Sequence, residues 1–269
     1  MAKTMAQEIK IAIIGAVDSE VDGLTDILHA GGEVSLPGMT VRLGRLRGQT
    51  ILLAASGVGK VNAAAATATL LSRFDIKQVW NIGSAGAYDG GPLRIGDVLI
   101  TETALCGDEG ILTSKDDLTN ASLGFPLVVR EGEAFFDAFP LNRSPLWKWA
   151  EEAVPSGWYH SGEGGALLPV IAEESARGQT FQLLRGPSLT VSMVSGDATV
   201  AAERAQRTGA LAENMEGSAV AQVCFRFGVP LLECRGISNV AGDRRKEHWQ
   251  LREAVGRCHA IVAALLVAL

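Results

Sequence analysis

The residues best suited to chemistry stand where a polar segment of the chain becomes apolar. Glu213 and Glu216 flank Asn214 and Met215, and small and apolar residues then recur at helical spacing through residues 219–227. This pattern predicts a strand end that turns into a buried helix. An ionised carboxylate removed from water must be hydrogen-bonded or paired. Glu216 is therefore either stabilised by the positive end of the helix dipole or accepts hydrogen bonds from the vicinal hydroxyls of a ligand.

Another glutamate follows the first apolar run of the chain. Residues 9–15 are apolar and end in glycine, and Glu20 comes in the loop or first turn after them. In open α/β sheets, ligands bind beyond the carboxyl ends of the strands. We therefore expect Glu20 at the ligand edge of the sheet. The apolar set after it predicts a helix over residues 21–28, with Asp18 or Ser19 as N-cap.

Two further strand ends consist of small residues. Residues 77–82 read as a buried strand that runs into residues 83–87, Gly-Ser-Ala-Gly-Ala. Small residues let backbone amides approach a ligand, and Ser84 adds a hydroxyl, although a plain tight turn explains the same pattern. Residues 56–60, Ser-Gly-Val-Gly-Lys, open an alanine-rich helix. They are not a phosphate-binding P-loop, because Ala54 stands where that motif requires a glycine.

The elements that must position these residues alternate between strand and helix. Further strands are predicted at residues 41–46 and 50–55, as a hairpin, and at residues 97–101, 189–195 and 229–238. Further helices are predicted over residues 61–73, 146–154, around 201–205, over 251–269 and near 171–177, and a long loop at residues 102–127. Alternation without a linker-like gap predicts one α/β domain over residues 1–269, with three α/β/α layers around a central twisted mixed sheet.

Bulk composition excludes several classes of protein. Of the 269 residues, 47% are hydrophobic, which is ample for a sizeable core, and the formal net charge is −6 with a pI near 5.3. An acidic chain of this kind argues against a general nucleic-acid binder. No apolar run approaches the roughly 18 residues of a membrane span, and the first ten residues lack a signal-peptide core. We therefore expect a cytoplasmic protein without nucleic-acid or membrane partners.

The sequence predicts neither a metal site nor a cofactor. The four cysteines contain no Cys-x-x-Cys pair, which favours buried roles in a reducing cytosol: Cys106, Cys224, Cys234 and Cys258. The four histidines show no metal-ligand spacing: His29, His160, His248 and His259. We read both sets as ordinary core or surface residues.

Five strand ends have unusual sequences: residues 15–20, 56–60, 81–87, 214–217 and 235–239. Each sequence is a weak signal alone, but the order of all five along the chain is specific. The set resembles the nucleoside phosphorylase and hydrolase superfamily. Within it, the chain is most similar to the nucleosidases that cleave methylthioadenosine and S-adenosylhomocysteine, and among these to the futalosine hydrolases of menaquinone biosynthesis. The resemblance runs from Ile11 to the C-terminal helix and is poorest over residues 108–186. It implies a nucleoside phosphorylase-like fold, a small-molecule nucleoside substrate and a homodimer or larger homo-oligomer.

The resemblance also implies roles for individual residues. Glu20 matches the glutamate that activates the attacking water, and Met215 with Glu216 matches the pair that packs on the ribose and accepts from its hydroxyls. Asp197 belongs to a segment that resembles the one leading to the base. The substrate-binding residues implied in this way are Ser84, Ala85, Gly86, Asp197, Met215, Glu216, Arg235 and Phe125.

Asn239 departs from the adenine-specific relatives, which have aspartate at this position. An asparagine can donate its NH2 group to a 6-keto oxygen and offer its carbonyl to a protonated N7. Asn239 therefore predicts hypoxanthine as the leaving base. The motif Ile-Ser-Asn-Val-Ala-Gly-Asp-Arg and the Leu-Gly-Phe-Pro sequence around Phe125 are similar to those of futalosine hydrolases, whose substrate carries hypoxanthine.

The implied reaction is hydrolysis of an N-glycosidic bond, with Glu20 as general base and Asn239 stabilising the departing base. The carboxyphenyl ketone chain of futalosine would need an apolar pocket, shared with residues 123–126 of a partner subunit. Residues 243–245 are either a solvated charge cluster or supply an arginine to the substrate's carboxylate.

Three alternatives stay open at this point. A phosphorolytic enzyme would place arginines around the phosphate, whereas the first loop offers Asp18 and Glu20. Hydrolysis of methylthioadenosine or S-adenosylhomocysteine is the second alternative, and a nucleoside-binding module without activity is the third.

Overall fold

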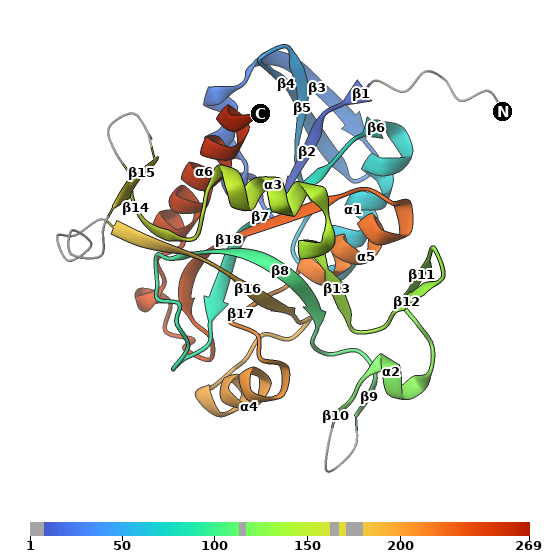
Figure 1. Ribbon diagram of the computed structural model, residues 1–269, viewed down its shortest axis with the longest axis vertical. Helices are drawn as coiled ribbons and strands as arrows, with labels where there is room; N and C mark the ends of the chain where they lie inside the picture. The colour runs from blue at the N-terminus through green and yellow to red at the C-terminus, as the bar shows by residue number, and fades with distance from the viewer. Residues whose placement is uncertain (1–7, 113–116, 162–166, 171–179) are drawn as a thin grey trace.

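One mixed sheet of twelve strands organises the computed structural model, which describes residues 8–112, 117–161, 167–170 and 180–269 (Figure 1). In order across the sheet, ten of the strands are β15 (Leu167–Val170), β14 (Gly157–Ser161), β16 (Thr180–Thr190), β8 (Val98–Cys106), β18 (Leu231–Val240), β7 (Val79–Ala87), β2 (Ile11–Gly15), β5 (Gln49–Ala55), β4 (Met39–Leu46) and β3 (His29–Leu36). The other two are β13 (Ala138–Pro140), which pairs with β8, and β17 (Ala212–Asn214), which bridges β16 and β7.

The centre of the sheet is parallel and buried on both faces. Strand β2 pairs in parallel with β5 and β7, and β18 pairs in parallel with β7. All five residues of β2 and nine of the ten residues of β18 are buried. Strands covered on both faces read as nearly continuous apolar runs, which explains why the sequence revealed them. Their parallel direction brings the carboxyl ends of β2, β5, β7 and β18 to one edge.

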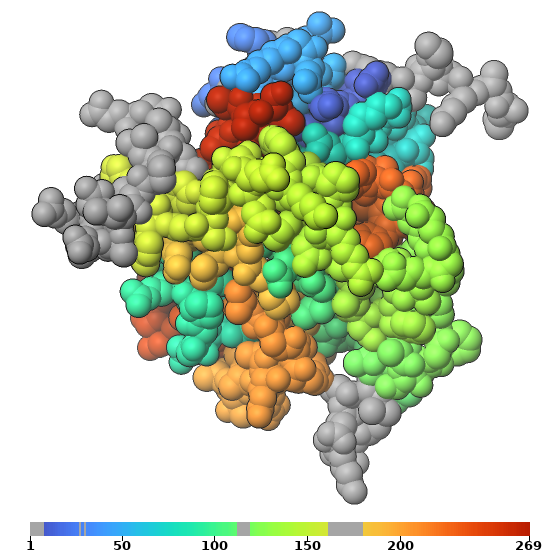
Figure 2. All heavy atoms as spheres, viewed as in Figure 1, coloured from blue at the N-terminus to red at the C-terminus, as the bar shows by residue number. Residues whose placement is uncertain are grey.

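Helices cover both faces of this sheet, as predicted for three layers (Figure 1). On one face, α6 (Leu251–Ala268) packs on β18, where the Sγ atoms of Cys258 and Cys234 lie 3.4 Å apart. Helix α3 (Pro145–Ala153) lies on the same face, with the rings of Trp149 and Trp80 6.3 Å apart. Figure 2 shows the atoms of α3 across the middle of this surface, below the end of α6.

The opposite face is covered by α5 (Gly217–Phe227) and α1 (Lys60–Arg73), which pack against each other. A Cβ atom on Gly217 would lie 2.3 Å from Oε2 of Glu233. Because alternate residues of a strand face opposite sides, Glu233 faces α5 and Cys234 faces α6. Helix α4 (Ala198–Thr208) connects β16 to β17.

Short elements complete the described chain. They are the parallel pair β1 (Glu8–Ile9) and β6 (Asp75–Ile76), the antiparallel pairs β9 (Ile111–Leu112) with β10 (Asp117–Leu118) and β11 (Val128–Arg130) with β12 (Glu133–Phe135), the short helix α2 (Asn120–Leu123), and 3-10 turns at Leu141–Arg143 and Lys246–His248. In the part of the chain described here, no helix is both long and apolar enough to cross a membrane.

Three predicted elements were wrong in type or extent. The helix predicted over residues 21–28 is a pair of 3-10 turns, Asp18–Glu20 and Asp22–Ile27, and neither has a side-chain cap. Gly23 and Thr25 are poor helix formers, and the chain must turn back directly into β3, which was not predicted.

The strand predicted at residues 189–195 begins at Thr180 and ends at Thr190, because polar residues interrupt its apolar pattern. The loop predicted over residues 102–127 contains the second half of β8 as well as β9, β10 and α2. The helix predicted near residues 171–177 lies outside the described residues.

Candidate active site

A cavity of about 800 Å³ opens at the edge where β2, β7 and β18 end. Its wall is built from the ends of these strands, from the turn after β17 and from one face of α6. The predicted site residues that line it are Glu20, Ser84, Ala85, Gly86, Met215, Glu216 and Asn239. A cavity of this size accommodates a small organic ligand such as a nucleoside.

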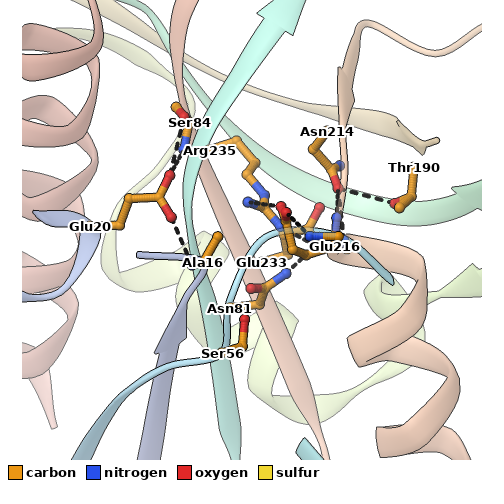
Figure 3. Close-up of polar contacts among 12 residues, drawn as sticks. Ala16, Glu20, Ser56, Asn81, Ser84, Thr190, Asn214, Glu216, Glu233 and Arg235 are labelled. Carbon is orange, nitrogen blue, oxygen red and sulfur yellow. Dashed lines mark hydrogen bonds and ion pairs between the residues drawn. The ribbon is translucent and has the colours of Figure 1, made fainter. Parts of the chain in front are cut away.

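Glu20 is buried at the floor of the cavity and is held by three hydrogen bonds. Its Oε1 accepts from the backbone N–H of Ser84 at 2.9 Å and from the Ser84 hydroxyl at 3.1 Å. Its Oε2 accepts from the backbone N–H of Ala16 at 2.8 Å. The carboxylate therefore joins the end of β2 to β7 in a fixed orientation (Figure 3).

The close packing around Glu20 requires glycine at residue 83. The Gly83 φ angle is +157°, and a Cβ atom there would lie 2.7 Å from Oε1 of Glu20 and 2.9 Å from Nη1 of Arg235. Because glycine lacks this atom, the two charged side chains can approach the backbone of β7. Residues 83–87 are not the tight turn that the pattern also allowed but the end of strand β7, and Gly83 is required there by this close packing.

His259 of α6 supports the same glutamate from the other side. Its Nε2 lies 2.6 Å from the main-chain oxygen of Glu20. A carbonyl oxygen can only accept, so Nε2 carries the proton and donates. This histidine was read from the sequence as an ordinary residue, and its spacing contains no signal that would have revealed this contact across 239 positions.

Glu216 lines the cavity from the turn before α5. Its Oε1 accepts from the backbone N–H of Gly59 at 2.9 Å, and its Oε2 lies 3.6 Å from Nη1 of Arg235. The amides at the start of α5 are instead capped by Asn214, whose Oδ1 accepts from the N–H groups of Glu216 at 3.0 Å and Gly217 at 2.7 Å. The Glu216 side chain therefore does not serve as the helix cap, and its carboxylate lines the cavity.

Burial raises the pKa of Glu216, and the positive charge of Arg235 and the hydrogen bond from Gly59 oppose this rise. The nearby carboxylates of Glu20 and Glu233 push the pKa of Glu216 further up. The floor of the cavity thus concentrates negative charge in a place that water reaches poorly.

Arg235 is the buried cation beneath these carboxylates (Figure 3). It is 1% exposed and lies 3.6 Å from Glu216 and 3.5 Å from Oε2 of Glu233. Burial alone would lower the pKa of Arg235, but the charges of Glu233, Glu216 and Glu20 raise it. The resemblance implies that Arg235 binds substrate, whereas Arg235 lies outside the cavity lining, behind Glu216.

Glu233 fixes Arg235 through its own hydrogen bonds. Its Oε2 accepts from Nδ2 of Asn81 at 2.8 Å, and its Oε1 accepts from the hydroxyls of Thr101 at 2.8 Å and Ser188 at 3.1 Å. Buried charges must be paired and hydrogen-bonded. This network meets that requirement below the cavity.

Asn239 lies on the wall of the cavity and is 9% exposed. Its Oδ1 accepts from the Ser238 hydroxyl at 2.8 Å, and its Nδ2 donates to the Val240 carbonyl at 2.9 Å. A primary amide has a second N–H and a second lone pair. Asn239 is therefore oriented by its neighbours and can still bind both a donor and an acceptor of a ligand.

Two predicted substrate-binding residues do not join the cavity. The Asp197 carboxylate is exposed and caps α4, where it accepts from the N–H groups of Thr199 at 2.9 Å and Val200 at 3.0 Å. Phe125 is 76% exposed and does not line the cavity of its own chain. That it completes the pocket of a partner subunit stays a prediction.

Sequence reasoning also missed residues that do line the cavity, namely Arg252, Val255 and His259 on α6, and Trp249 just before it. The sequence predicts the helix over residues 251–269 but contains no signal that one of its faces lines the site. Among the described residues, no cluster of His, Cys, Asp and Glu could hold a metal ion.

Comparison with known proteins places the chain among enzymes of one family. The phosphorylase superfamily model matches residues 10–267. A futalosine hydrolase of Thermus thermophilus is 34% identical over 82% of this chain and 83% of its own length. A 5′-methylthioadenosine/S-adenosylhomocysteine nucleosidase of a Marinomonas species is 30% identical over 89% of this chain and 90% of its own length.

Solved structures share the fold. The methylthioadenosine/S-adenosylhomocysteine nucleosidase of Neisseria meningitidis, in complex with methylthio-immucillin-A, aligns with a TM-score of 0.74 at 24% identity, covering 97% of this chain and 99% of that one. The futalosine hydrolase of Helicobacter pylori aligns with a TM-score of 0.74 at 23% identity, covering 97% and 98%. The resemblance inferred from the strand ends is confirmed, and the chain belongs to the phosphorylase superfamily.

Proposed function

We propose that the protein hydrolyses the N-glycosidic bond of a 5′-substituted purine nucleoside and releases hypoxanthine, with futalosine as its substrate. The observation that carries the proposal is the cavity that two buried carboxylates, Glu20 and Glu216, share with the amide of Asn239. The likeness to the Thermus thermophilus futalosine hydrolase supports the choice of substrate.

In this reaction Glu20 acts as the general base. Its carboxylate is oriented by Ser84 and Ala16 and takes a proton from a water molecule. The hydroxide adds to the anomeric carbon of the ribose, while the C–N bond breaks and its electron pair leaves with the purine. Solvent water protonates the purine at N7, and Glu20 returns its proton to solvent. Positioned proton transfer of this kind typically contributes about 10²- to 10⁴-fold to the rate.

Glu216 would bind the ribose hydroxyls. Each of its oxygens already has one protein partner, Gly59 on one side and Arg235 on the other. A carboxylate oxygen has two lone pairs, so both oxygens can still accept from the vicinal hydroxyls. Met215 lines the cavity beside Glu216 and would pack on the sugar.

Asn239 would stabilise the departing base. Its free N–H can donate to the 6-keto oxygen of hypoxanthine, and its carbonyl can accept from a protonated N7. An adenine would present an amino group to that N–H. One donor would then face another, which disfavours adenine.

Water is favoured over phosphate as the nucleophile. The floor of the cavity presents the carboxylates of Glu20 and Glu216, and the one guanidinium among the floor residues described above, Arg235, is paired with Glu216 and Glu233. Two carboxylates repel a phosphate anion at this short range.

A second candidate is hydrolysis of methylthioadenosine or S-adenosylhomocysteine. It is supported by relatives with that name that are 30% to 32% identical. The amide of Asn239 argues against an adenine substrate.

The test is to measure hypoxanthine and adenine released from futalosine, inosine and methylthioadenosine, with and without phosphate. We expect phosphate-independent release of hypoxanthine, fastest from futalosine. Strict dependence on phosphate would reject hydrolysis, and faster turnover of methylthioadenosine would reject the proposed base preference. Binding without any turnover would indicate a nucleoside-binding module.

We also propose a homodimer or larger homo-oligomer. Apolar side chains are exposed at the cavity, where Val58 is part of the lining, and on α1, where Val61 is 83% exposed. Sedimentation equilibrium of the purified protein tests this, and a monomer at micromolar concentration would contradict it.

A further inference from the structure

The cavity is acidic at its floor and basic at its rim. The carboxylates of Glu20, Glu213 and Glu216 are buried within the lining. Arg244 and Arg252 line the same cavity, but both are exposed. An elongated ligand in this cavity would therefore meet opposite charges at its two ends.

The pairing of the nearby arginines separates them into two kinds. Arg245 is bound by Asp243 at 2.8 Å, and Arg257 is bound by Glu253. Across the described residues, by contrast, Arg244 and Arg252 form no ion pair with any carboxylate. The two arginines that line the cavity are thus the two whose charge is left available.

Asp243 is not available for an ion pair with Arg244, because its carboxylate already binds other residues. Oδ1 accepts from the N–H and Nε of Arg245 at 3.0 and 2.9 Å, and Oδ2 is bound by Nη2 of Arg245 and by Nδ1 of His248, each at 2.8 Å. This arrangement holds the acidic neighbour away from the cavity.

Trp249 fixes the position of Arg244. The Trp249 Nε1 donates to the main-chain oxygen of Asp243 at 2.9 Å, and the Arg244 guanidinium lies 4.8 Å from the centre of the indole ring. A stacked guanidinium keeps its N–H donors free at its edge. The indole also contributes an apolar surface to the cavity, together with Val255.

The geometry of α6 sets how far this basic rim lies from the floor. Arg252 precedes His259 by seven residues, which is about two turns, so both lie on the same face of the helix and about 10 Å apart along its axis. The Nε2 of His259 touches the main chain of Glu20. An anion at Arg252 is therefore too distant to attack the glycosidic bond beside Glu20. A position this far from the floor can instead hold the far end of a substituent.

Arg252 also stands where a helix disfavours a cation. It is the second residue of α6, and a positive charge in the first turn opposes the helix dipole. A bound anion would relieve this repulsion and interact favourably with the same dipole.

We propose that Arg244 and Arg252 form an anion subsite that binds a carboxylate at the outer end of the 5′ substituent of the nucleoside, with Trp249 and Val255 packing along the substituent. This inference rests on the proposed nucleosidase function for its substrate class. It adds to that function the two residues that would bind the terminal carboxylate, about two helix turns from the reacting bond.

The test compares two nucleosides that differ only in charge, 5′-S-(3-carboxypropyl)-5′-thioinosine and its methyl ester. The measured quantity is the ratio of kcat/KM for the acid to kcat/KM for the ester. We expect the wild-type protein to favour the acid by about tenfold or more, which corresponds to about 1.4 kcal/mol. Arg244→Gln and Arg252→Gln should each lower the ratio several-fold, and the double variant should bring it close to one.

Matched variants control for charge and for folding. Lys246→Gln removes a neighbouring positive charge that is exposed and does not line the cavity, so the ratio should stay at the wild-type value. Arg252→Lys should recover part of the ratio, because the charge is kept while the two-pronged geometry is lost. Added salt should lower the wild-type ratio, since exposed charges are screened. A damaged fold would reduce the rates for acid and ester together and leave their ratio unchanged.

Calorimetric binding of both probes to the wild-type and double-variant proteins separates the two hypotheses. If neither probe is hydrolysed but the acid binds more tightly than the ester in an arginine-dependent manner, the proposed reaction fails and the subsite stands. If the acid and ester behave alike in wild-type protein, or if the double variant keeps the preference, the subsite is refuted.

Discussion

Substitution of Glu20 by glutamine tests the proposed base most directly, because it keeps the shape and removes the negative charge. The carboxylate accepts three hydrogen bonds, two from Ser84 and one from the N–H of Ala16. The NH2 group of a glutamine must face either Ala16 or Ser84, so at least one donor would meet another donor. We expect this mismatch to lower the free energy of unfolding by about 1–3 kcal/mol.

The effect on turnover should be larger than the effect on folding. A neutral amide cannot take the proton of water, so kcat should fall by about 10³-fold, within the range that general-base catalysis usually contributes. Hypoxanthine release can be followed by a coupled absorbance assay, nucleoside binding by calorimetry and stability by urea denaturation. Ser84→Ala is the matched control, since it removes only the hydroxyl and should cost about 1 kcal/mol.

Two outcomes would refute the role of Glu20. A variant whose kcat stays within about tenfold of the wild-type value would show that another group activates the water. A variant that loses nucleoside binding and turnover together, while its fold is intact, would assign Glu20 to substrate binding instead.

The remaining predictions concern the neighbours of Glu20. Arg235→Met leaves the buried carboxylates of Glu216 and Glu233 without their shared cation, so the free energy of unfolding in urea should fall by about 3–5 kcal/mol; a loss below about 1 kcal/mol would contradict this pairing. Asn239→Asp replaces an N–H donor by an acceptor, so the preference for methylthioadenosine over 5′-methylthioinosine should rise by about tenfold to a hundredfold in kcat/KM, and an unchanged preference would disprove the role in base selection. Because burial raises the pKa of Glu216 and the ionised form must accept the ribose hydroxyls, kcat/KM should fall as the pH drops through this raised value, above the ordinary value of 4.5. The same shift favours the protonated form in the folded state, so its stabilising effect is present below the unfolded pKa and is lost as pH rises through the folded one. In denaturant titrations, the free energy of unfolding of Glu216→Gln should therefore rise relative to that of the wild-type protein as the pH increases from 4 to 8. A difference between the two proteins that does not change with pH would contradict the shift.

Strand ends could be predicted from the sequence because the central strands are covered on both faces. Buried parallel strands give apolar runs that stop where the ligand edge begins, as in β2 before Glu20 and in β7 around Ser84. Outer elements were harder to predict because polar residues interrupt the pattern of β16, and glycine and threonine prevent a regular helix after Glu20. The single-domain organisation stays a prediction, and one continuous sheet is the feature that supports it.

The sequence could not predict whether a side chain at the site lines the cavity or lies beneath its floor. Simple alternation along β18 would put Arg235 and Asn239 on the same face. The register between β18 and β7 shifts between Ile237 and Asn239, and a bulge of this kind re-aims the side chains beyond it. Arg235 therefore stays beneath the floor, while Asn239 lines the cavity.

Asp197 lies outside the cavity lining for a different reason. An aspartate that immediately precedes an alanine-rich helix is a strong N-cap signal, and its carboxylate serves that purpose at α4. The sequence thus contains the signal for the cap, and the substrate-binding role that the resemblance implies for Asp197 stays a prediction.

The distribution of charge gives the floor of the cavity a chemical bias. Glu20, Glu216 and Glu233 surround the single guanidinium of Arg235, so the carboxylates outnumber the cation. In the proposed reaction the ribose becomes cationic as the bond to the purine breaks, and fixed negative charge stabilises such a transition state. The excess of negative charge that raises the pKa of Glu216 would therefore also favour bond cleavage. The same negative charge would repel an anionic part of the substrate from the floor, so that Arg244 and Arg252 would have to bind this part at the rim.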